Sequence, residues 1–405
     1  MTVEYPQANG ASQPSRFSGY DHLRFTVTNA KQAASYYCTR FGFKHVAYCG
    51  LETGSRDMAA HVVRCGNATL VFECPLQPGA TPEYVQDIIK RGDGVKDVAF
   101  TVNDCRKVYE QAIARGAKSI RAPEVLEDEN GRVVISTIAT YGDVYHTLVE
   151  RHKYRGVFLP GYQDPATSLR YVDPLDDILP PVPLGYIDHV VGSQPENMML
   201  DATDYYEKVL GFHRFWSVDD KDICTEYSAM RSIVMTDPSQ KIMVPINEPA
   251  SGKKKSSIQE FVDFYGGAGV QHIAIHTNDI ISAVSNLRKR GCGFLRVPDT
   301  YYTALRTAIA KHNKTANQPI DEDLDALQKQ NILIDYDENG YLMQIFTRPV
   351  EDRPTLFFEV IQRRNFDGFG AGNFKSLFEA LEKEQASRGN LTNMVVADEP
   401  MNTAA

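Results

Sequence analysis

The sequence predicts an α+β fold built from four strand–helix–strands units, two in each half of the chain. The main observation is an internal repeat, in which residues 20–43 resemble residues 187–212 and residues 95–123 match residues 270–298 without a gap. The second observation is length, because 405 residues exceed what one hydrophobic core usually supports. A duplicated molecule with two domains accounts for both observations.

Turn and capping signals mark the ends of the predicted elements. The tetrapeptide Asp-Glu-Asn-Gly occurs at 128–131 and at 337–340, where it predicts a hairpin turn between strands. The offset between these copies is 209 rather than 175, so the second half has gained 34 residues, mostly in a helical-looking segment at 301–330. Three helices are predicted from paired N-cap and C-cap residues, namely Asn29 and Gly42, Asn103 and Gly116, and Asn278 and Gly291.

The overall charge limits the classes of partner. A net charge of -9 argues against nucleic acid or an anionic membrane surface, because both need a basic face on the protein. No run approaches the ~18 consecutive apolar residues of a membrane span. Seven cysteines without a CxxC pair indicate reduced thiols. We therefore expect a cytoplasmic protein that acts on a small molecule, with no nucleic-acid and no membrane partner.

Three polar side chains interrupt apolar, strand-like runs in the second half. Glu359 lies between Phe358 and Val360, where an unpaired carboxylate is costly to bury unless a cation meets it. His189 and His272 each stand in a similar short apolar run. Two imidazoles and one carboxylate form the 2-His-1-carboxylate facial triad, which leaves positions open on Fe(II). For either histidine alone a hydrogen-bonded core residue is the commoner role, but the three residues together favour a metal site.

The first half offers an internal comparison for this triad. Alignment of the two halves places His22 opposite His189, Asp97 opposite His272 and Thr147 opposite Glu359. The first half therefore keeps one plausible ligand of three. This asymmetry predicts that one copy holds metal and that the other is structural.

The C-terminal part of the chain predicts one further helix. A Gly-rich turn at 368–372 precedes a segment at 374–388 whose apolar residues recur at helical spacing. Two interpretations fit this helix equally well: a lid across the pocket, or an ordinary packing helix.

Composition gives the domain boundaries. Residues 160–185 hold six prolines and little periodicity, which is typical of a linker. The predicted organisation is a disordered leader (1–19), an N-terminal structural domain of two units without metal (20–159), the linker (160–185), a C-terminal catalytic domain that ends in the helix at 374–388 (186–388), and a mobile tail (389–405).

Several blocks of sequence together resemble the 4-hydroxyphenylpyruvate dioxygenase family. They are Val-Pro-Ile-Asn-Glu-Pro (244–249), Gly-Ala-Gly-Val-Gln-His-Ile-Ala (267–274), Gln-Ile-Phe-Thr-Arg-Pro (344–349), and Phe-Glu-Val-Ile-Gln-Arg with Gly-Phe-Gly-Ala-Gly-Asn-Phe (358–363 and 368–374). The short connection between these last two blocks resembles the animal and fungal members. The family belongs to the vicinal oxygen chelate superfamily, so the resemblance implies duplicated βαβββ modules in two open-barrel, glyoxalase-like domains.

The resemblance also implies the chemistry. It places one Fe(II) per chain on His189, His272 and Glu359. It implies conversion of 4-hydroxyphenylpyruvate and O2 to homogentisate and CO2, as in tyrosine and phenylalanine catabolism, by a homodimer. The substrate-binding residues that it implies are Ser228, Asn247, Gln271, Gln344, Phe346, Phe369 and Phe374.

One position departs from the family pattern. The usual Ser-Gln-Ile-Gln reads Ser-Ser-Ile-Gln at 256–259, so Ser257 replaces a pocket glutamine and the anchoring of substrate there is in question. Three alternatives stay open: a 4-hydroxymandelate synthase with the same substrate and metal, an extradiol ring-cleaving dioxygenase, and a non-catalytic binding protein on the same scaffold.

Overall fold

In the computed structural model, the order strand, helix and three strands occurs four times along the chain. The structure describes residues 3–4, 16–79, 82–170, 173–218 and 224–393. In the first half the two modules are β2 (Phe17–Thr26), α1 (Ala30–Phe41), β3 (Lys44–Cys49), β4 (Met58–Cys65), β5 (Ala68–Pro75), and β6 (Gly94–Val102), α3 (Cys105–Ala114), β7 (Ser119–Asp128), β8 (Gly131–Ala139), β9 (Tyr145–Glu150).

The second half repeats this order with longer insertions. Its modules are β10 (Leu184–Ser193), α6 (Met199–Tyr205), β11 (His213–Val218), β12 (Ala229–Thr236), β13 (Met243–Ala250), and β14 (Gly269–Thr277), α8 (Ile280–Lys289), β15 (Leu333–Tyr336), β16 (Tyr341–Phe346), β17 (Phe357–Arg364). The additional helices are α2 (Pro82–Arg91), α7 (Ser257–Tyr265), α9 (Asp299–His312), α10 (Leu324–Gln330) and α11 (Phe374–Ser387). The predicted helical insertion is therefore two helices, α9 and α10.

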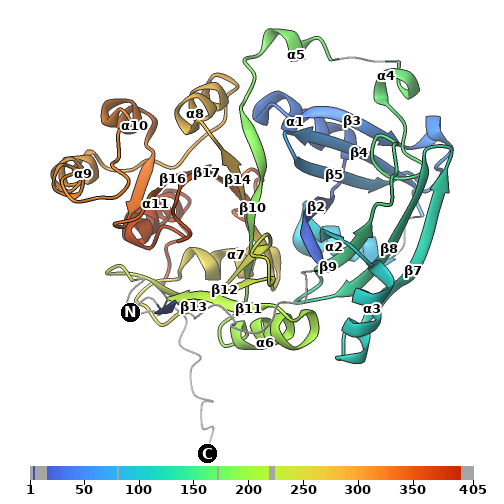
Figure 1. Cartoon of the computed structure of the whole chain (residues 1–405), viewed down its shortest axis with the longest axis horizontal. Coiled ribbons are helices and arrows are strands. Elements are labelled where there is room, and N and C mark those ends of the chain that lie inside the picture. Colours follow the sequence, from blue (N-terminus) through green and yellow to red (C-terminus); the bar gives the residue numbers. More distant parts are fainter. Residues whose placement is uncertain (1–2, 5–15, 80–81, 171–172, 219–223, 394–405) are drawn as a thin grey trace, which may run out of the picture.

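The modules of each half form one curled sheet, and the two sheets lie side by side (Figure 1). The strand orders are β3-β4-β5-β2-β6-β9-β8-β7 in the first half and β1-β11-β12-β13-β10-β14-β17-β16-β15 in the second. In both sheets the first strands of the two modules pair antiparallel, and the last strand of each module runs parallel to its first. The predicted duplication of βαβββ modules is confirmed.

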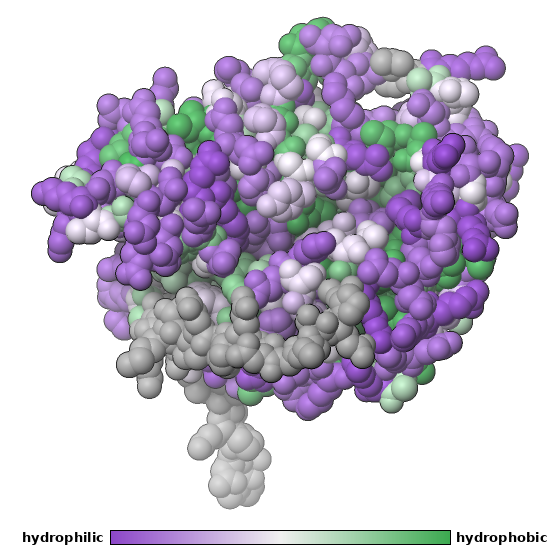
Figure 2. All heavy atoms as spheres, in the orientation of Figure 1, coloured by the Kyte–Doolittle hydropathy of each residue, from purple (hydrophilic) through white to green (hydrophobic). Residues whose placement is uncertain are grey.

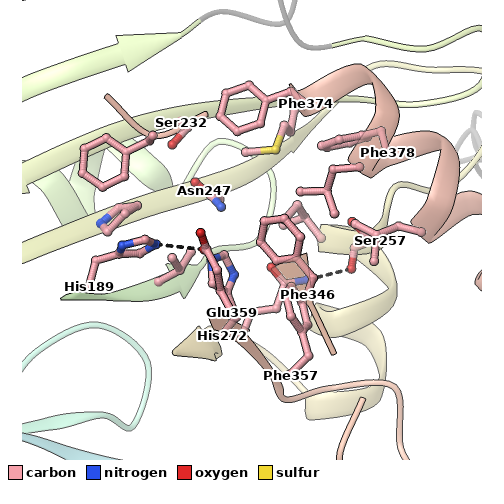
Figure 3. A pocket seen from close by; sticks show the side chains of 18 of the residues that line it. His189, Ser232, Asn247, Ser257, His272, Phe346, Phe357, Glu359, Phe374 and Phe378 are labelled. Atoms are coloured by element: carbon pink, nitrogen blue, oxygen red, sulfur yellow. Dashed lines mark hydrogen bonds and ion pairs between the residues drawn. The ribbon is translucent and has the colours of Figure 1, made fainter. Parts of the chain in front are cut away.

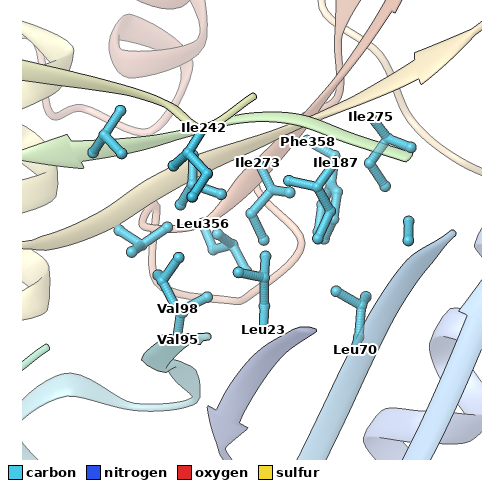
Figure 4. Close-up of a cluster of buried hydrophobic side chains, with 14 of the residues drawn as sticks. Leu23, Leu70, Val95, Val98, Ile187, Ile242, Ile273, Ile275, Leu356 and Phe358 are labelled. Carbon is cyan, nitrogen blue, oxygen red and sulfur yellow. The ribbon is translucent and has the colours of Figure 1, made fainter. Parts of the chain in front are cut away.

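A shared hydrophobic core joins the two sheets (Figure 4). Leu23 and Val98 of the first sheet and Ile273 and Phe358 of the second are all at most 2% exposed. The Phe358 ring lies 4.9 Å from the ring of Phe41 on α1, measured between centroids. Because side chains alternate along a strand, the neighbours of these core residues point to the opposite, concave face of each sheet, where a site can form.

Two of the three predicted N-caps are off by one residue. Asn29 caps α1 as predicted, and its side chain accepts the N–H of Gln32. At α3 and α8, however, the N-cap is the aspartate that follows the predicted asparagine at 103 or 278. The carboxylates of Asp104 and Asp279 accept the backbone N–H three residues on, so the helices begin one residue later.

The predicted leader, linker and tail contain elements that the sequence did not predict. β1 (Val3–Glu4) pairs with β11, and β2 begins at Phe17, because this buried residue continues the pairing with β6. The linker contains the short helices α4 (Pro165–Ser168) and α5 (Leu175–Ile178). In the predicted tail, Asn390 donates a hydrogen bond to Glu260, while residues 394–405 lie outside the described residues.

The visible surface is mostly hydrophilic, with smaller hydrophobic areas (Figure 2). No helix in the described part of the chain is long and apolar enough to cross a membrane.

Candidate metal centre and substrate pocket

Strand register brings the three predicted ligands together on the concave face of the second sheet. β10 pairs with β14 so that His189 is opposite Ala274, and β17 pairs with β14 so that Glu359 is opposite Ala274 from the other side. His272 lies two residues before Ala274 on the same strand face. The ligand atoms of the three residues all lie within 4.8 Å of one another.

The electrostatics of this cluster favour a cation at its centre. The Glu359 carboxylate is 3% exposed, and its Oε2 lies 3.2 Å from His189 Nε2 and 3.6 Å from His272 Nε2. Burial lowers the pKa of His189, but Glu359 and Asp188 outweigh burial and raise this pKa to about 9. Burial, followed by the charge of His189, holds the pKa of His272 well below its usual value. Glu359 Oε1 has no hydrogen-bond partner among the described residues, so the donor set fits a divalent metal ion.

Two residues that the sequence analysis missed support His189. Its Nδ1 lies 2.7 Å from Asp188 Oδ1, which leaves Nε2 directed toward the cluster. Arg363 donates two hydrogen bonds to the Asp188 carboxylate, at 2.9 and 2.8 Å. A signal for both was present, because Asp21 and Arg151 stand at the matching positions of the first half.

The pocket beside the ligands is lined mainly by aromatic and aliphatic side chains (Figure 3). Phe346 on β16 lies next to the ligands, with its ring centroid 6.2 Å from that of His272. Phe374, at the start of α11, enters from the opposite side together with Phe378. Trp216 on β11, which was not predicted, contacts Phe374 at 6.0 Å between ring centroids. These apolar walls suit an aromatic substrate.

The structure places most of the predicted substrate residues in this pocket. Those that line it are Asn247, Gln271, Phe346, Phe369 and Phe374. Gln271 is held on both sides, since its Oε1 accepts from Ser193 Oγ at 2.7 Å and its Nε2 donates to the Ser257 carbonyl at 3.2 Å. Asn247 Oδ1 has no partner within the described residues and is available to a ligand.

Two predicted residues do not line the pocket. Ser228 lies just before β12, and its hydroxyl donates instead to Glu382 of α11 at 2.6 Å. Ser232, which was not predicted, lines the pocket, because the register of β12 and β13 sets it directly opposite Asn247. Gln344 is on the same strand face as Phe346 but lies beside Gly370, outside the pocket lining.

The predicted C-terminal helix is confirmed and covers the pocket. Leu377, Phe378 and Leu381 of α11 all line it. Besides the Ser228 contact, Glu382 accepts a hydrogen bond from Thr225. At the end of the helix, Arg388 donates to the buried Glu260 of α7 at 2.9 Å. The helix is therefore tied to the segment before β12 and to α7 while its apolar face covers the pocket.

The corresponding region of the first sheet is filled. In the first sheet His22 is opposite Ala99, just as His189 is opposite Ala274 in the second. Two residues further along, Arg24 is opposite Asp97, where the second sheet has Val191 opposite His272. The Arg24 guanidinium donates to Asp97 at 3.2 Å and to Glu73 at 2.9 Å. The ring of Phe158 packs edge-on against His22, with 5.0 Å between centroids. A side-chain cation and an aromatic plug thus occupy the space that the second half leaves open.

Comparisons with known proteins agree with this architecture. The family model described as Glyoxalase/Bleomycin resistance protein/Dioxygenase superfamily matches residues 19–138 and 186–345, and the chain belongs to that superfamily. Two curated relatives are named 4-hydroxyphenylpyruvate dioxygenase. The one from Tetrahymena thermophila is 55% identical, and the match covers 98% of this chain and 97% of the relative. The one from Xenopus tropicalis is 57% identical, and the match covers 93% of this chain and 94% of the relative. The chain belongs to the 4-hydroxyphenylpyruvate dioxygenase family.

A solved structure of a related enzyme has the same fold. It is a triple mutant of 4-hydroxymandelate synthase from Streptomyces coelicolor, with a TM-score of 0.77 and 30% identity over 91% of this chain and 99% of that one. Its lower identity sets it further from this chain than the dioxygenases.

Proposed function

We propose that this protein uses Fe(II) to convert 4-hydroxyphenylpyruvate and O2 to homogentisate and CO2. The observation that carries the proposal is that His189, His272 and Glu359 come together in the lining of an aromatic pocket. Membership of the dioxygenase family supports the choice of substrate. The donor set of two imidazoles and a carboxylate supports iron.

In this proposal the side chains of the protein bind the substrate, orient it and shield it from water. Fe(II) held by the three ligands would supply the Lewis acidity and redox chemistry that O2 activation by a 2-oxo acid requires. Phe346 and Phe374 would hold the substrate ring from two sides and limit its rotation. Asn247, Gln271 and Ser232 line the pocket and would hydrogen-bond its polar atoms. α11 excludes water, which protects a reactive intermediate from side reactions.

One alternative product is favoured by a specific observation, the structural likeness to 4-hydroxymandelate synthase. The deciding experiment loads the anaerobic protein with Fe(II), adds 4-hydroxyphenylpyruvate and O2, and identifies the aromatic product. Homogentisate with one CO2 released per O2 consumed is the expected result. Hydroxymandelate as the product would mean that the enzyme hydroxylates the side chain of the substrate and not its ring. Iron binding without turnover would mean that the protein acts on another substrate.

Several finer features belong to the same proposal. The resemblance supports a homodimer, which sedimentation equilibrium tests, and a cytoplasmic location, which fractionation of the source cells tests. The proposed division into a structural domain (20–159) and a catalytic domain (186–388) is supported by the filled centre of the first sheet and the open pocket of the second.

A further inference from the structure

Arg363 connects the metal ligand His189 to the wall of the substrate pocket. On one side it forms the bidentate pair with Asp188, which in turn holds His189 Nδ1. On the other side its Nη1 donates to the carbonyls of Phe366 and Gly368, at 3.1 and 2.5 Å. The same guanidinium lies over the ring of Phe369 at 5.3 Å.

Phe369 closes this set of contacts. Its ring packs edge-to-face against His189 with 5.3 Å between centroids, and it lines the pocket. The ligand, the carboxylate, the guanidinium and the aromatic ring therefore form a cycle in which each member touches the next. We expect a change in Arg363 or Asp188 to shift the orientation of the other members, because a bidentate pair has a specific geometry.

The first half contains the same cycle without a metal ligand set. Arg151 donates two hydrogen bonds to Asp21, both at 2.8 Å, and lies over the ring of Phe158 at 5.3 Å. Asp21 holds His22 Nδ1 at 2.8 Å, and His22 meets Phe158 edge-on. Arg151 follows Thr147 by four residues, as Arg363 follows Glu359. The same cycle of histidine, aspartate, arginine and phenylalanine therefore occurs in both halves. In the second half it lies beside the candidate ligands, and in the first half it lies beside Arg24.

We propose that Arg363 is a positioning residue that acts through Asp188. It holds His189 Nε2 in the ligating orientation and at the same time seats Phe369 against the pocket, so that metal affinity and substrate binding depend on one guanidinium. This inference rests on the proposed metal centre. Arg151 makes the matching contacts in the first half and provides a control for purely structural effects.

The test compares Arg363→Gln with Arg151→Gln in the full chain, using Co(II) as the metal probe. Affinity is measured by titration of the visible absorption of bound Co(II), and stability by urea unfolding. Mutation of an outer-shell residue that supports a metal ligand typically costs about 10–100-fold in metal affinity. We expect such a loss in Arg363→Gln, an affinity near wild type in Arg151→Gln, and a similar loss of stability in both.

Equal Co(II) affinity in Arg363→Gln and wild type would overturn the positioning role, as would an equal loss in both variants. Wild-type protein that binds no Co(II) would instead overturn the metal centre itself. Should the glutamine variants fail to fold, Arg363→Lys and Arg151→Lys keep the charge but lose the bidentate fork, and the same difference in affinity is expected between them.

A rescue experiment separates charge from packing. Arg363 and Asp188 also line a second cavity of about 470 Å³ at the junction of the two halves, so a small solute can reach the space vacated in Arg363→Ala. We expect guanidinium at millimolar concentration to raise the Co(II) affinity of this variant and urea to leave it unchanged. An equal response to both solutes, or to neither, would contradict a role for the guanidinium charge.

The same variants report on the pocket. Because Phe369 loses its cation neighbour in Arg363→Gln, KM for the substrate should rise even when Fe(II) is saturating, whereas KM of Arg151→Gln should stay at the wild-type value. A KM unchanged in both would contradict the coupling between the ligand and the pocket wall.

Discussion

Arg24 Nη2 lies 3.2 Å from Asp97 Oδ2, at the place in the first sheet that matches the candidate metal centre of the second. Asp97 is the register counterpart of His272 and also accepts hydrogen bonds from Thr147, the counterpart of Glu359. A guanidinium therefore supplies the positive charge that a metal ion would supply in the other half. This pairing explains physically why only one half keeps a ligand set.

Replacing Arg24 tests this charge compensation. In Arg24→Met the Asp97 carboxylate, which is 1% exposed, loses its cation. Breaking a buried pair in this way costs about 3 kcal/mol of unfolding free energy, measurable by urea titration. Arg24→Lys should lose much less. A loss below ~1 kcal/mol in Arg24→Met, the range of a surface pair, would contradict the role of Arg24 as the internal cation.

Removal of a metal ligand should abolish both metal binding and turnover. We expect Glu359→Ala and His272→Ala to keep the fold, as judged by circular dichroism, and to lose bound iron in metal analysis. The matched control is Thr147→Val, since Thr147 holds the position of Glu359 in the first half and should leave iron content unchanged. Iron at wild-type occupancy in either ligand variant would refute the assignment.

Weakening the contacts of α11 should open the pocket. Glu382 is 6% exposed and accepts hydrogen bonds from Ser228 and Thr225. Hydrogen bonds to a charged group contribute about 1.5–3 kcal/mol, so Glu382→Ala should raise KM about tenfold and consume O2 without matching product. Lys383→Ala, on the exposed face, serves as control. Unchanged KM and coupling would reduce α11 to a packing helix.

Restoring the family glutamine at position 257 should tighten substrate binding. Ser257 lines the pocket at the start of α7, and its short side chain leaves room beside Gln271. One added hydrogen bond is worth about 1 kcal/mol, so Ser257→Gln should lower KM roughly fivefold with kcat little changed. A higher KM would mean that the pocket has adapted to the smaller residue.

Stability should fall with rising pH because of Glu351. Burial, followed by the charges of Asp93 and Asp352, raises the pKa of Glu351 from 4.5 to about 8. Between these values the folded protein holds a proton that the unfolded chain releases, so the stabilisation present below pH 4.5 is lost as pH approaches 8. Glu351→Gln should therefore raise Tm more at pH 8 than at pH 5. The control is Glu338→Gln at an exposed position, which should shift Tm equally at pH 5 and pH 8. An equal shift at both pH values in Glu351→Gln would contradict the titration of Glu351.

The three candidate ligands were predictable because a charged or imidazole side chain inside an apolar strand is locally unfavourable, as at Glu359. The internal repeat then identified their counterparts in the first half. The strand register confirmed that Thr147 holds the position in the first sheet that Glu359 holds in the second. The resemblance implied Ser228, which lies just before β12, whereas Ser232 on β12 lines the pocket. Only the pairing of β12 with β13 shows which of them is beside Asn247.

The contacts of Arg363 with Asp188 could not be predicted in the same way. These residues are 175 positions apart, and although Asp21 and Arg151 stand at the matching positions of the first half, the repeat does not show that the two side chains meet. The same holds for Arg24, which the sequence analysis did not single out. Its role depends on Glu73 and Asp97 reaching it from two other strands.

The linear pattern of residues is sufficient to predict the modules, their duplication and the three candidate ligands. The reason is that periodicity, turn residues and buried charges act over short distances in the chain. The fold in three dimensions decided which concave face stays open. In the first sheet Arg24 and Phe158 fill that face, while in the second α11 only covers it. That difference arises from packing between segments far apart in the chain, where the free energy depends on which groups meet and not on their order.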